Sequence, residues 1–292
     1  MTSTPLDQFK YFIKQKTILV QLIKINILVW LFIAFLSLFS FLLQLEISTN
    51  IIDWLALPSS FTTLLTRPWT IITYMFLHQD FFHILFNMLM LFFGGFLFTQ
   101  YIGSKKLLQT YLLGGLFGGI FFMAAYNIFP VFNQLVSHSF ALGASASVIA
   151  IVIAVATFKP DLVVQLMFLG NVKLKYIAIF LLLLDLVSIE KGNPGGHIAH
   201  LGGAFYGVLM ALNHKYKYIK LPDFAFEKFF HRKPKMRFYK NENPTRPVSD
   251  EEFNRQKAEK QKYIDIILDK ISKSGYETLT KEEKEFLFKS SK

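Results

Sequence analysis

Gly143-Ala144-Ser145-Ala146 and Ala199-His200-Leu201-Gly202-Gly203 are two short polar strings inside long apolar stretches of the chain. Each string places one reactive side chain, Ser145 or His200, among small neighbours. A polar group at membrane depth costs free energy, so its presence there indicates a function. A third polar pair, His83 and Asn87, stands four residues apart on another apolar stretch, which puts both side chains on one face of a helix.

The composition around these strings is that of a membrane protein. Of the 292 residues, 53% are hydrophobic and 17% are charged, and the mean hydropathy is +0.39. A soluble domain of this length needs more charge to cover its surface. Residues 1–213 hold 11 Lys and Arg and 7 Asp and Glu, whereas residues 214–292 hold 20 and 13. The chain has no cysteine, which excludes disulfides and a cysteine nucleophile.

The apolar runs predict an all-α, polytopic membrane protein, because about 20 apolar residues cross the hydrocarbon core of a bilayer. We expect six transmembrane helices, at residues 25–45, 81–99, 107–128, 143–158, 165–187 and 197–213. The expected organisation is a cytoplasmic N-terminal segment (1–24), a six-helix membrane domain (25–213), a basic, aromatic juxtamembrane linker (214–248) and a helical tail (249–292).

Positive charge alternates from loop to loop. Lysines precede the first expected helix and lie between the second and third and between the fourth and fifth, whereas the other loops are neutral or acidic. The positive-inside rule then places both termini in the cytoplasm.

The basic tail has two parts with different patterns. From His214 to Lys240, basic residues alternate with five phenylalanines, which favours adsorption to anionic lipids over nucleic-acid binding. Further on, Ser249-Asp250-Glu251-Glu252 is a capping box, and Thr280-Lys281-Glu282-Glu283 opens a second helix. The tail is therefore expected to form a small helical hairpin.

Ser145 and His200 each have a structural alternative. A serine in a membrane helix usually bonds a carbonyl one turn earlier or joins two helices, and a lone histidine can bond a carbonyl. Two rows of small residues at four-residue spacing favour a shared site, because such rows let helices approach closely. If the rows face each other, Ser145 and His200 come within reach as nucleophile and general base. The rows are Ala146, Ala150, Ala154 and Ala199, Gly203, Gly207.

His83 and Asn87 can be read as helix-packing residues or as donors to an oxyanion, and the second role suits both better. His197 could pair with His200 on a metal ion, but zinc needs three or four ligands, and we see no acid at ligand spacing. We expect no metal, no cofactor, and His197 at the aqueous end of its helix. Nor do we expect an acid behind His200, because neither Asp185 nor Glu190 has a spacing that places it there.

Together these motifs resemble the rhomboid family of intramembrane serine proteases, of the bacterial type, over about residues 65–213. The similar motifs are the segment from Arg67 to His78, the H-x-x-x-N of His83 to Asn87, Gly103-Ser104-Lys105-Lys106, the G-x-S of Gly143 to Ser145, and the A-H-x-G-G-x-x-x-G of Ala199 to Gly207.

The resemblance implies a serine endopeptidase that cleaves transmembrane proteins in a bacterial inner membrane. It implies Ser145 as nucleophile, His200 as base, and His83, Asn87 and the Ser145 N–H as oxyanion donors. Gly143, Gly203 and Gly207 are then the packing residues near the site.

The chain departs from the family pattern at three points. Ala146 stands where glycine is commonest, Ile149 replaces an aromatic residue that often stacks on the base, and no acid stands at Phe98 or Thr99. The alternative function is a catalytically silent relative that binds transmembrane helices, although such relatives typically lack the Ser or the His. A transporter is disfavoured, because the two halves of the sequence show no repeat symmetry.

Overall fold

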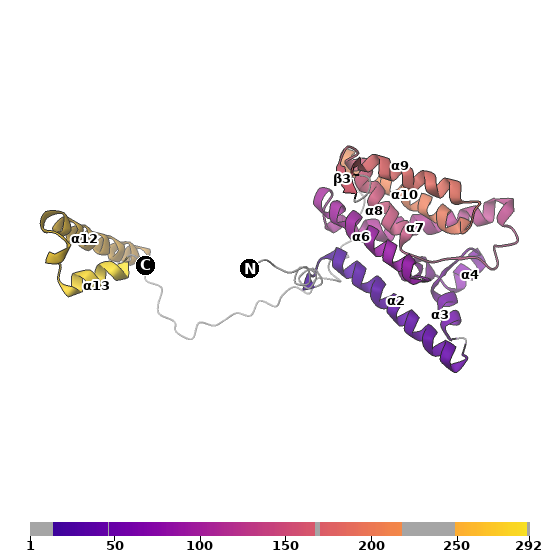
Figure 1. Cartoon of the computed structure of the whole chain (residues 1–292), viewed down its shortest axis with the longest axis horizontal. Helices are drawn as coiled ribbons and strands as arrows, with labels where there is room; N and C mark the ends of the chain where they lie inside the picture. The colour runs from indigo at the N-terminus through magenta and orange to yellow at the C-terminus, as the bar shows by residue number, and fades with distance from the viewer. Residues whose placement is uncertain (1–13, 46, 167–169, 218–248, 291–292) are drawn as a thin grey trace. The chain divides into compact units, whose positions relative to one another are not determined.

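The computed structural model of the chain describes residues 14–45, 47–166, 170–217 and 249–290 (Figure 1). It divides into two compact units, Met1–Arg232 and Lys233–Lys292. Most of the expected juxtamembrane linker, residues 218–248, and the first half of the N-terminal segment, residues 1–13, lie outside the described residues.

The described residues of the first unit include six longer helices, and each overlaps one of the expected helices. Of the described helices, α2, α6 and α7 are long and apolar enough to cross a membrane, and α8 is a shorter apolar helix. The six are α2 (Ile18–Leu43), α6 (Phe81–Tyr101), α7 (Lys105–Ile128), α8 (Ser145–Phe158), α9 (Leu174–Ser188) and α10 (Pro194–Tyr216).

Short elements join these helices, and some of them are strands, so the described part of the chain is mostly helical, with a few short strands that the sequence did not predict. Strand β1 (Leu57–Pro58) pairs antiparallel with β2 (Phe140–Ala141), and β3 (Val163–Leu166) pairs with β4 (Gly170–Lys173). The short helices are α3 (Ile47–Leu55), α4 (Phe61–Thr66), α5 (Thr70–Thr73), η1 (Tyr74–Phe76) and η2 (Pro130–Phe132).

The hairpin of β3 and β4 corrects the expected helix at 165–187. In β3, exposed and half-buried residues alternate from Val163 to Leu166. This is the period of a strand rather than of a helix. The Leu174 N–H then donates to the Leu162 carbonyl across the base of the hairpin. Helix α9 can therefore begin only at Leu174.

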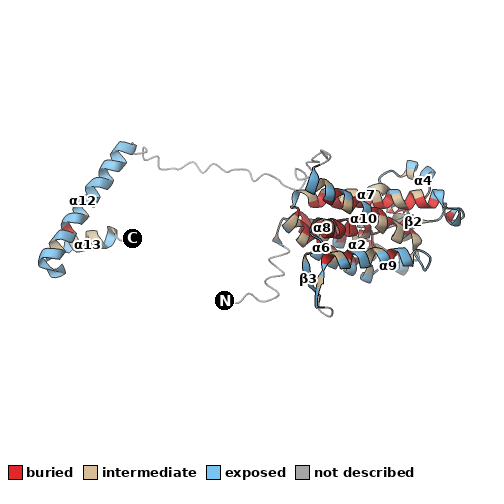
Figure 2. Ribbon diagram, turned by 90° about the horizontal axis from the view of Figure 1, so that it is seen from above, coloured by how far each residue is buried: buried red, intermediate tan, exposed pale blue. Residues whose placement is uncertain are grey.

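The core is built around α8. Every residue from Ala146 to Ala156 is buried, and α6, α7, α9 and α10 all contact this helix. Figure 2 shows the buried residues gathered on the central helices α7, α8 and α10. A 14-residue helix with no exposed polar face is stable only when enclosed by other helices or lipid.

The outer helices expose large apolar side chains. Leu28, Phe32 and Phe35 on α2 are 64%, 59% and 58% exposed, and Phe180 and Val187 on α9 are 62% and 58% exposed. Apolar faces of this extent are unfavourable in water. They suit contact with lipid, where the helices satisfy their own backbone hydrogen bonds.

The start of α7 and the ends of α8 and α10 lie together at one end of the helix bundle. Lys106 Nζ, at the start of α7, is 2.7 Å from His214 Nδ1 near the end of α10. The His214 ring also contacts Phe158, the last residue of α8, with a centroid distance of 5.2 Å. Ser145, at the start of α8, therefore lies toward the opposite end of the bundle from Lys106.

The second unit consists of α12 (Asp250–Ser274), η3 (Tyr276–Thr278) and α13 (Lys281–Ser290). The expected caps are present: the Glu252 N–H donates to Ser249 Oγ at 3.3 Å, and the Thr280 N–H donates to Glu283 Oε2 at 2.7 Å. Lys270 Nζ on α12 donates to Glu283 Oε1 at 2.9 Å, which ties the two helices together.

Candidate active site

A cavity of about 690 Å³ opens between α6, α8 and α10. Ser145, His200, His83 and Asn87 all line it, so one cavity collects the side chains that the sequence singled out from three separate helices. Ser145 and His200 are both described in the structure, and no hydrogen bond joins them. Catalytic hydrogen bonds of this kind are often long before substrate binds.

Ser145 is the first residue of α8, and the backbone before it brings it to the cavity wall. Gly143 has a φ of +127°, a left-handed value that a side chain rarely tolerates. Its N–H donates to the Tyr74 carbonyl at 2.9 Å. A Cβ at this position would lie 2.9 Å from His83 Nε2 and 3.6 Å from Ser145 Oγ, so Gly143 leaves this space open between the two side chains.

His83 and Asn87 are arranged as hydrogen-bond donors. The Gln79 N–H donates to His83 Nδ1 over a long 3.5 Å, which assigns the ring proton to Nε2, the atom beside Gly143. Asn87 Nδ2 donates one hydrogen to the His83 carbonyl at 2.8 Å and keeps its second for another acceptor. The Asp80 carboxylate caps the helix by accepting from the His83 N–H at 2.8 Å.

An acid does stand behind His200, so the expectation that none would was wrong. Asp185 Oδ1 is 2.8 Å from His200 Nδ1 and 2.8 Å from His197 Nδ1. Asp185 is buried. His197, which was expected at the aqueous end of its helix, contacts this buried carboxylate. Helices α9 and α10 form an antiparallel pair with a short connection, which brings together residues 12 and 15 positions apart.

A signal for this acid was present in the sequence. Asp185 lies three residues before the end of α9, and His197 and His200 lie within the first two turns of α10. In a tight helical hairpin such positions are at the same depth. An ionisable residue in an apolar run is itself a functional hypothesis.

Among the described residues, Asp185, His197 and His200 form the group whose side chains could hold a metal ion. Their ligand atoms all lie within 4.8 Å of one another. Both histidine nitrogens, however, are already at hydrogen-bond distance from a single carboxylate oxygen. The expectation that no acid stands at ligand spacing was wrong, and the absence of a metal stays a prediction.

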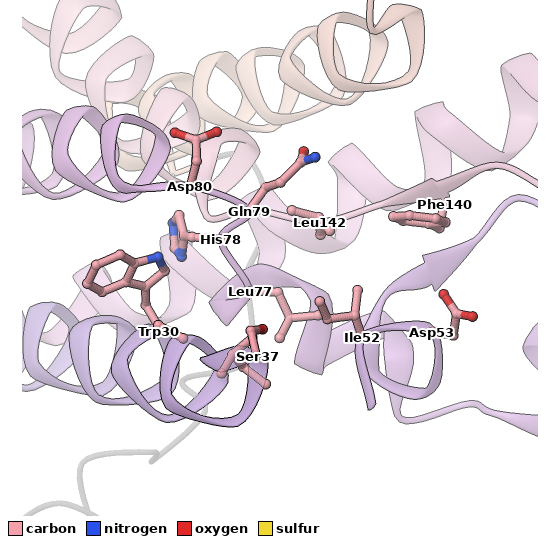
Figure 3. A pocket seen from close by; sticks show the side chains of 12 residues that line it. Trp30, Ser37, Ile52, Asp53, Leu77, His78, Gln79, Asp80, Phe140 and Leu142 are labelled. Carbon is pink, nitrogen blue, oxygen red and sulfur yellow. The ribbon is translucent and has the colours of Figure 1, made fainter. Parts of the chain in front are cut away.

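A second hollow of about 470 Å³ lies beside the first and shares Gln79, Asp80, Phe140 and Leu142 with it. In Figure 3, Trp30 and Ser37 of α2 and Ile52 of α3 face the segment from Leu77 to Asp80. This hollow is a candidate path for water to the cavity.

His78 lines this second hollow next to the oxyanion candidates. Its ring packs edge-on against the His83 ring, 5.0 Å between centroids. Burial, and secondarily the neighbouring His83, lowers the pKa of His78 from 6.5 to about 4. His78 is therefore neutral at physiological pH.

The two rows of small residues lie against each other. A Cβ at Gly203 would overlap the Ala146 carbonyl oxygen, and one at Gly207 would lie 2.5 Å from the Ala150 carbonyl oxygen. The Ala146 methyl group, where glycine is commonest, fits because Gly118 of α7 faces it. Ile149 and Phe98 are both buried apolar residues.

Comparison with protein-family models gives two matches along the chain. The model of the Rhomboid domain family matches residues 65–216, slightly more than half of the chain, and residues 249–292 match a family of unknown function (DUF6576).

Among curated proteins, the chain is similar to the RHOMBOID-like protein 12, mitochondrial, of Arabidopsis thaliana. The two are 33% identical over 144 residues, which is 46% of this chain and 43% of the relative. The chain thus matches less than half the length of that relative. On the strength of the family match, the chain belongs to the rhomboid family.

Proposed function

We propose that the chain is an intramembrane serine endopeptidase that cleaves transmembrane proteins. The observation that carries the proposal is the shared cavity, which is lined by one nucleophile, one base and two hydrogen-bond donors. Family membership supports it, and the open space at Gly143 gives a reacting carbonyl room beside Ser145 and His83.

In the proposed reaction, a substrate helix enters between helices and unwinds locally, which exposes a peptide bond. Ser145 Oγ attacks the carbonyl carbon while His200 takes its proton. The oxyanion receives hydrogen bonds from His83 Nε2, Asn87 Nδ2 and the Ser145 N–H. His200 then protonates the leaving amine, and water hydrolyses the acyl-enzyme with His200 again as base.

The proposed architecture is a six-helix membrane domain with both termini in the cytoplasm. The gathering of Lys106, His214 and the end of α8 at one end of the bundle supports this orientation, because positive charge favours the cytoplasmic face. Ser145 then lies toward the outer face. We place the protein in a bacterial inner membrane; the mitochondrial name belongs to the Arabidopsis relative.

The alternative is a silent rhomboid-like protein that binds transmembrane helices without cleaving them. Covalent labelling separates the two. The full chain, reconstituted in liposomes, should react with a fluorophosphonate probe and cleave a transmembrane reporter, and Ser145→Ala should do neither. His200→Ala should also abolish cleavage.

Ser147→Ala is the matched control, because Ser147 is a fully buried serine one position beyond Ala146 on the same helix. A hydroxyl between membrane helices contributes only about 0.6 kcal/mol on average, so both serine variants should stay folded. Cleavage that survives in Ser145→Ala would exclude the protease and leave the silent alternative.

A further inference from the structure

A single carboxylate oxygen joins the two histidines of α10. Asp185 Oδ1 lies 2.8 Å from both His197 Nδ1 and His200 Nδ1. An ionised carboxylate can only accept hydrogen bonds, so each Nδ1 must carry a proton. His200 then has its Nε2 free to accept a proton, and this is the state that a general base requires.

We infer that Asp185 is a positioning residue for His200, a role that rests on the proposed function. Asp185 fixes the His200 tautomer with Nδ1 protonated and turns Nε2 toward the cavity that Ser145 lines. It also stabilises the imidazolium that forms when His200 takes the Ser145 proton. The site then works as three groups: Ser145 and His200 exchange the proton, and Asp185 holds His200 in place.

The burial of Asp185 supports this role. Its side chain is 9% exposed, whereas the neighbouring Leu184 and Leu186 on α9 are 52% and 53% exposed. A buried carboxylate is unfavourable unless its oxygens are hydrogen-bonded. Two histidine donors on one oxygen meet part of that need, and they bind Asp185 to the same helix that carries the base.

His197 is the second donor and helps to hold the carboxylate. Its ring lies 5.9 Å from the His200 ring, at 86° between the planes, so the two histidines reach Asp185 from different directions. The carboxylate is held from both, which restricts how His200 can rotate.

The distances favour hydrogen bonds over a metal site. Two ligands of a tetrahedral zinc ion, each about 2.0 Å from the metal, lie about 3.3 Å apart. The two Nδ1–Oδ1 distances of 2.8 Å are shorter and equal those of N–H···O hydrogen bonds. Zinc would also require both nitrogens to lose their protons.

The test compares Asp185→Asn with Glu190→Gln in the full chain reconstituted in liposomes. Both changes remove one negative charge near the end of α9, but Glu190 is exposed. The amide of Asp185→Asn can donate to His200 Nδ1 and favour the wrong tautomer. We expect kcat for the reporter to fall by up to about 10⁴-fold, the loss that the same acid-to-amide change causes in a serine protease with a Ser-His-Asp triad.

KM should change less than about threefold, because Asp185 does not touch substrate, and the rate of fluorophosphonate labelling should fall with kcat. Asp185→Glu should recover part of the loss, and Glu190→Gln should match the wild type. A merely structural Asp185 would instead lower the melting temperature while the folded fraction keeps its kcat and labelling rate.

Two outcomes would overturn the inference: a kcat per folded molecule of Asp185→Asn that equals that of the wild type, or activity that a chelator removes and zinc restores. If Asp185→Asn fails to fold, the labelling rate of the folded Asp185→Glu variant decides, since a displaced carboxylate should slow it. Ser145→Ala, run in parallel, shows separately whether the proposed protease function holds.

Discussion

Gly203 on α10 lies against the Ala146 carbonyl group on α8, so closely that a Cβ at position 203 would overlap the carbonyl oxygen. Ala146 follows the candidate nucleophile, and Gly203 is three residues after the candidate base. The separation of these two backbones therefore sets how far Ser145 lies from His200.

Gly203→Ala should push α8 and α10 apart. The obstacle is backbone, which cannot rotate away, so we expect a loss of about 1–3 kcal/mol of stability and a large loss of cleavage. Gly95→Ala is the control: its Cβ would meet only the end of the flexible Leu19 side chain. Both substitutions gain the same helix propensity. Thermal melts and reporter cleavage in the two variants measure the difference, and equal behaviour would contradict the close-packing argument.

The sequence predicted the long helices and four of the polar residues that line the cavity, because both depend on local patterns. Apolar runs locate helices, and an isolated serine or histidine in such a run stands out. The contact of Asp185 with His200 was missed because it depends on the packing of α9 against α10; the local pattern shows only that an ionisable residue stands in an apolar run. The β3–β4 hairpin was missed because Val163 to Leu166 is as apolar as the helix that follows, and only its pairing with Gly170–Lys173 distinguishes it.

His78 should make the protein less stable in acid. The folded state lowers the pKa of His78 from 6.5 to about 4, chiefly by burial, so the unfolded chain binds a proton at a higher pH than the folded one does. Stability is therefore fully present above pH 6.5 and falls as the pH drops toward 4. The loss from this residue is about 2 kcal/mol at pH 5 and on the order of 3 kcal/mol below pH 4.

Melting temperatures of the wild type and His78→Phe in detergent, taken from pH 7.5 down to pH 4, measure this contribution. The variant cannot be protonated at this position, so its melting temperature should fall less over that range. Parallel curves for the two proteins would show that His78 does not contribute to the acid sensitivity.

The absence of cysteine allows the orientation to be tested by single introduced thiols. Lys105→Cys and Lys159→Cys replace exposed residues near the basic end of the bundle, whereas Gln134→Cys and Lys191→Cys replace exposed residues in the other loops. A membrane-impermeant maleimide added to intact cells should label only the second pair. The wild type gives no background, and lysed cells should label all four. Labelling of Lys105→Cys in intact cells would invert the proposed topology.

Substitution of an oxyanion donor, His83 or Asn87, should slow the chemical step more than it weakens substrate binding. His83 Nε2 and the free Asn87 Nδ2 hydrogen serve a charge that exists only during the reaction, so each substitution should lower kcat more than it raises KM. We expect Asn87→Ala and His83→Ala to lose about 10- to 1,000-fold in kcat, since one side-chain donor is typically worth 10²–10³ and the others partly cover for it.

Fluorophosphonate labelling distinguishes these donors from the nucleophile and its base. Ser145 should still be labelled in Asn87→Ala and His83→Ala, although more slowly, because Ser145 and His200 remain. Asn87 also donates to the His83 carbonyl one turn earlier, so melting temperatures must accompany the kinetics. An Asn87→Ala protein that keeps its full kcat, or that loses its fold, would assign Asn87 to helix packing. The oxyanion would then depend on His83 and on the N–H groups at the start of α8, where the helix dipole also favours negative charge.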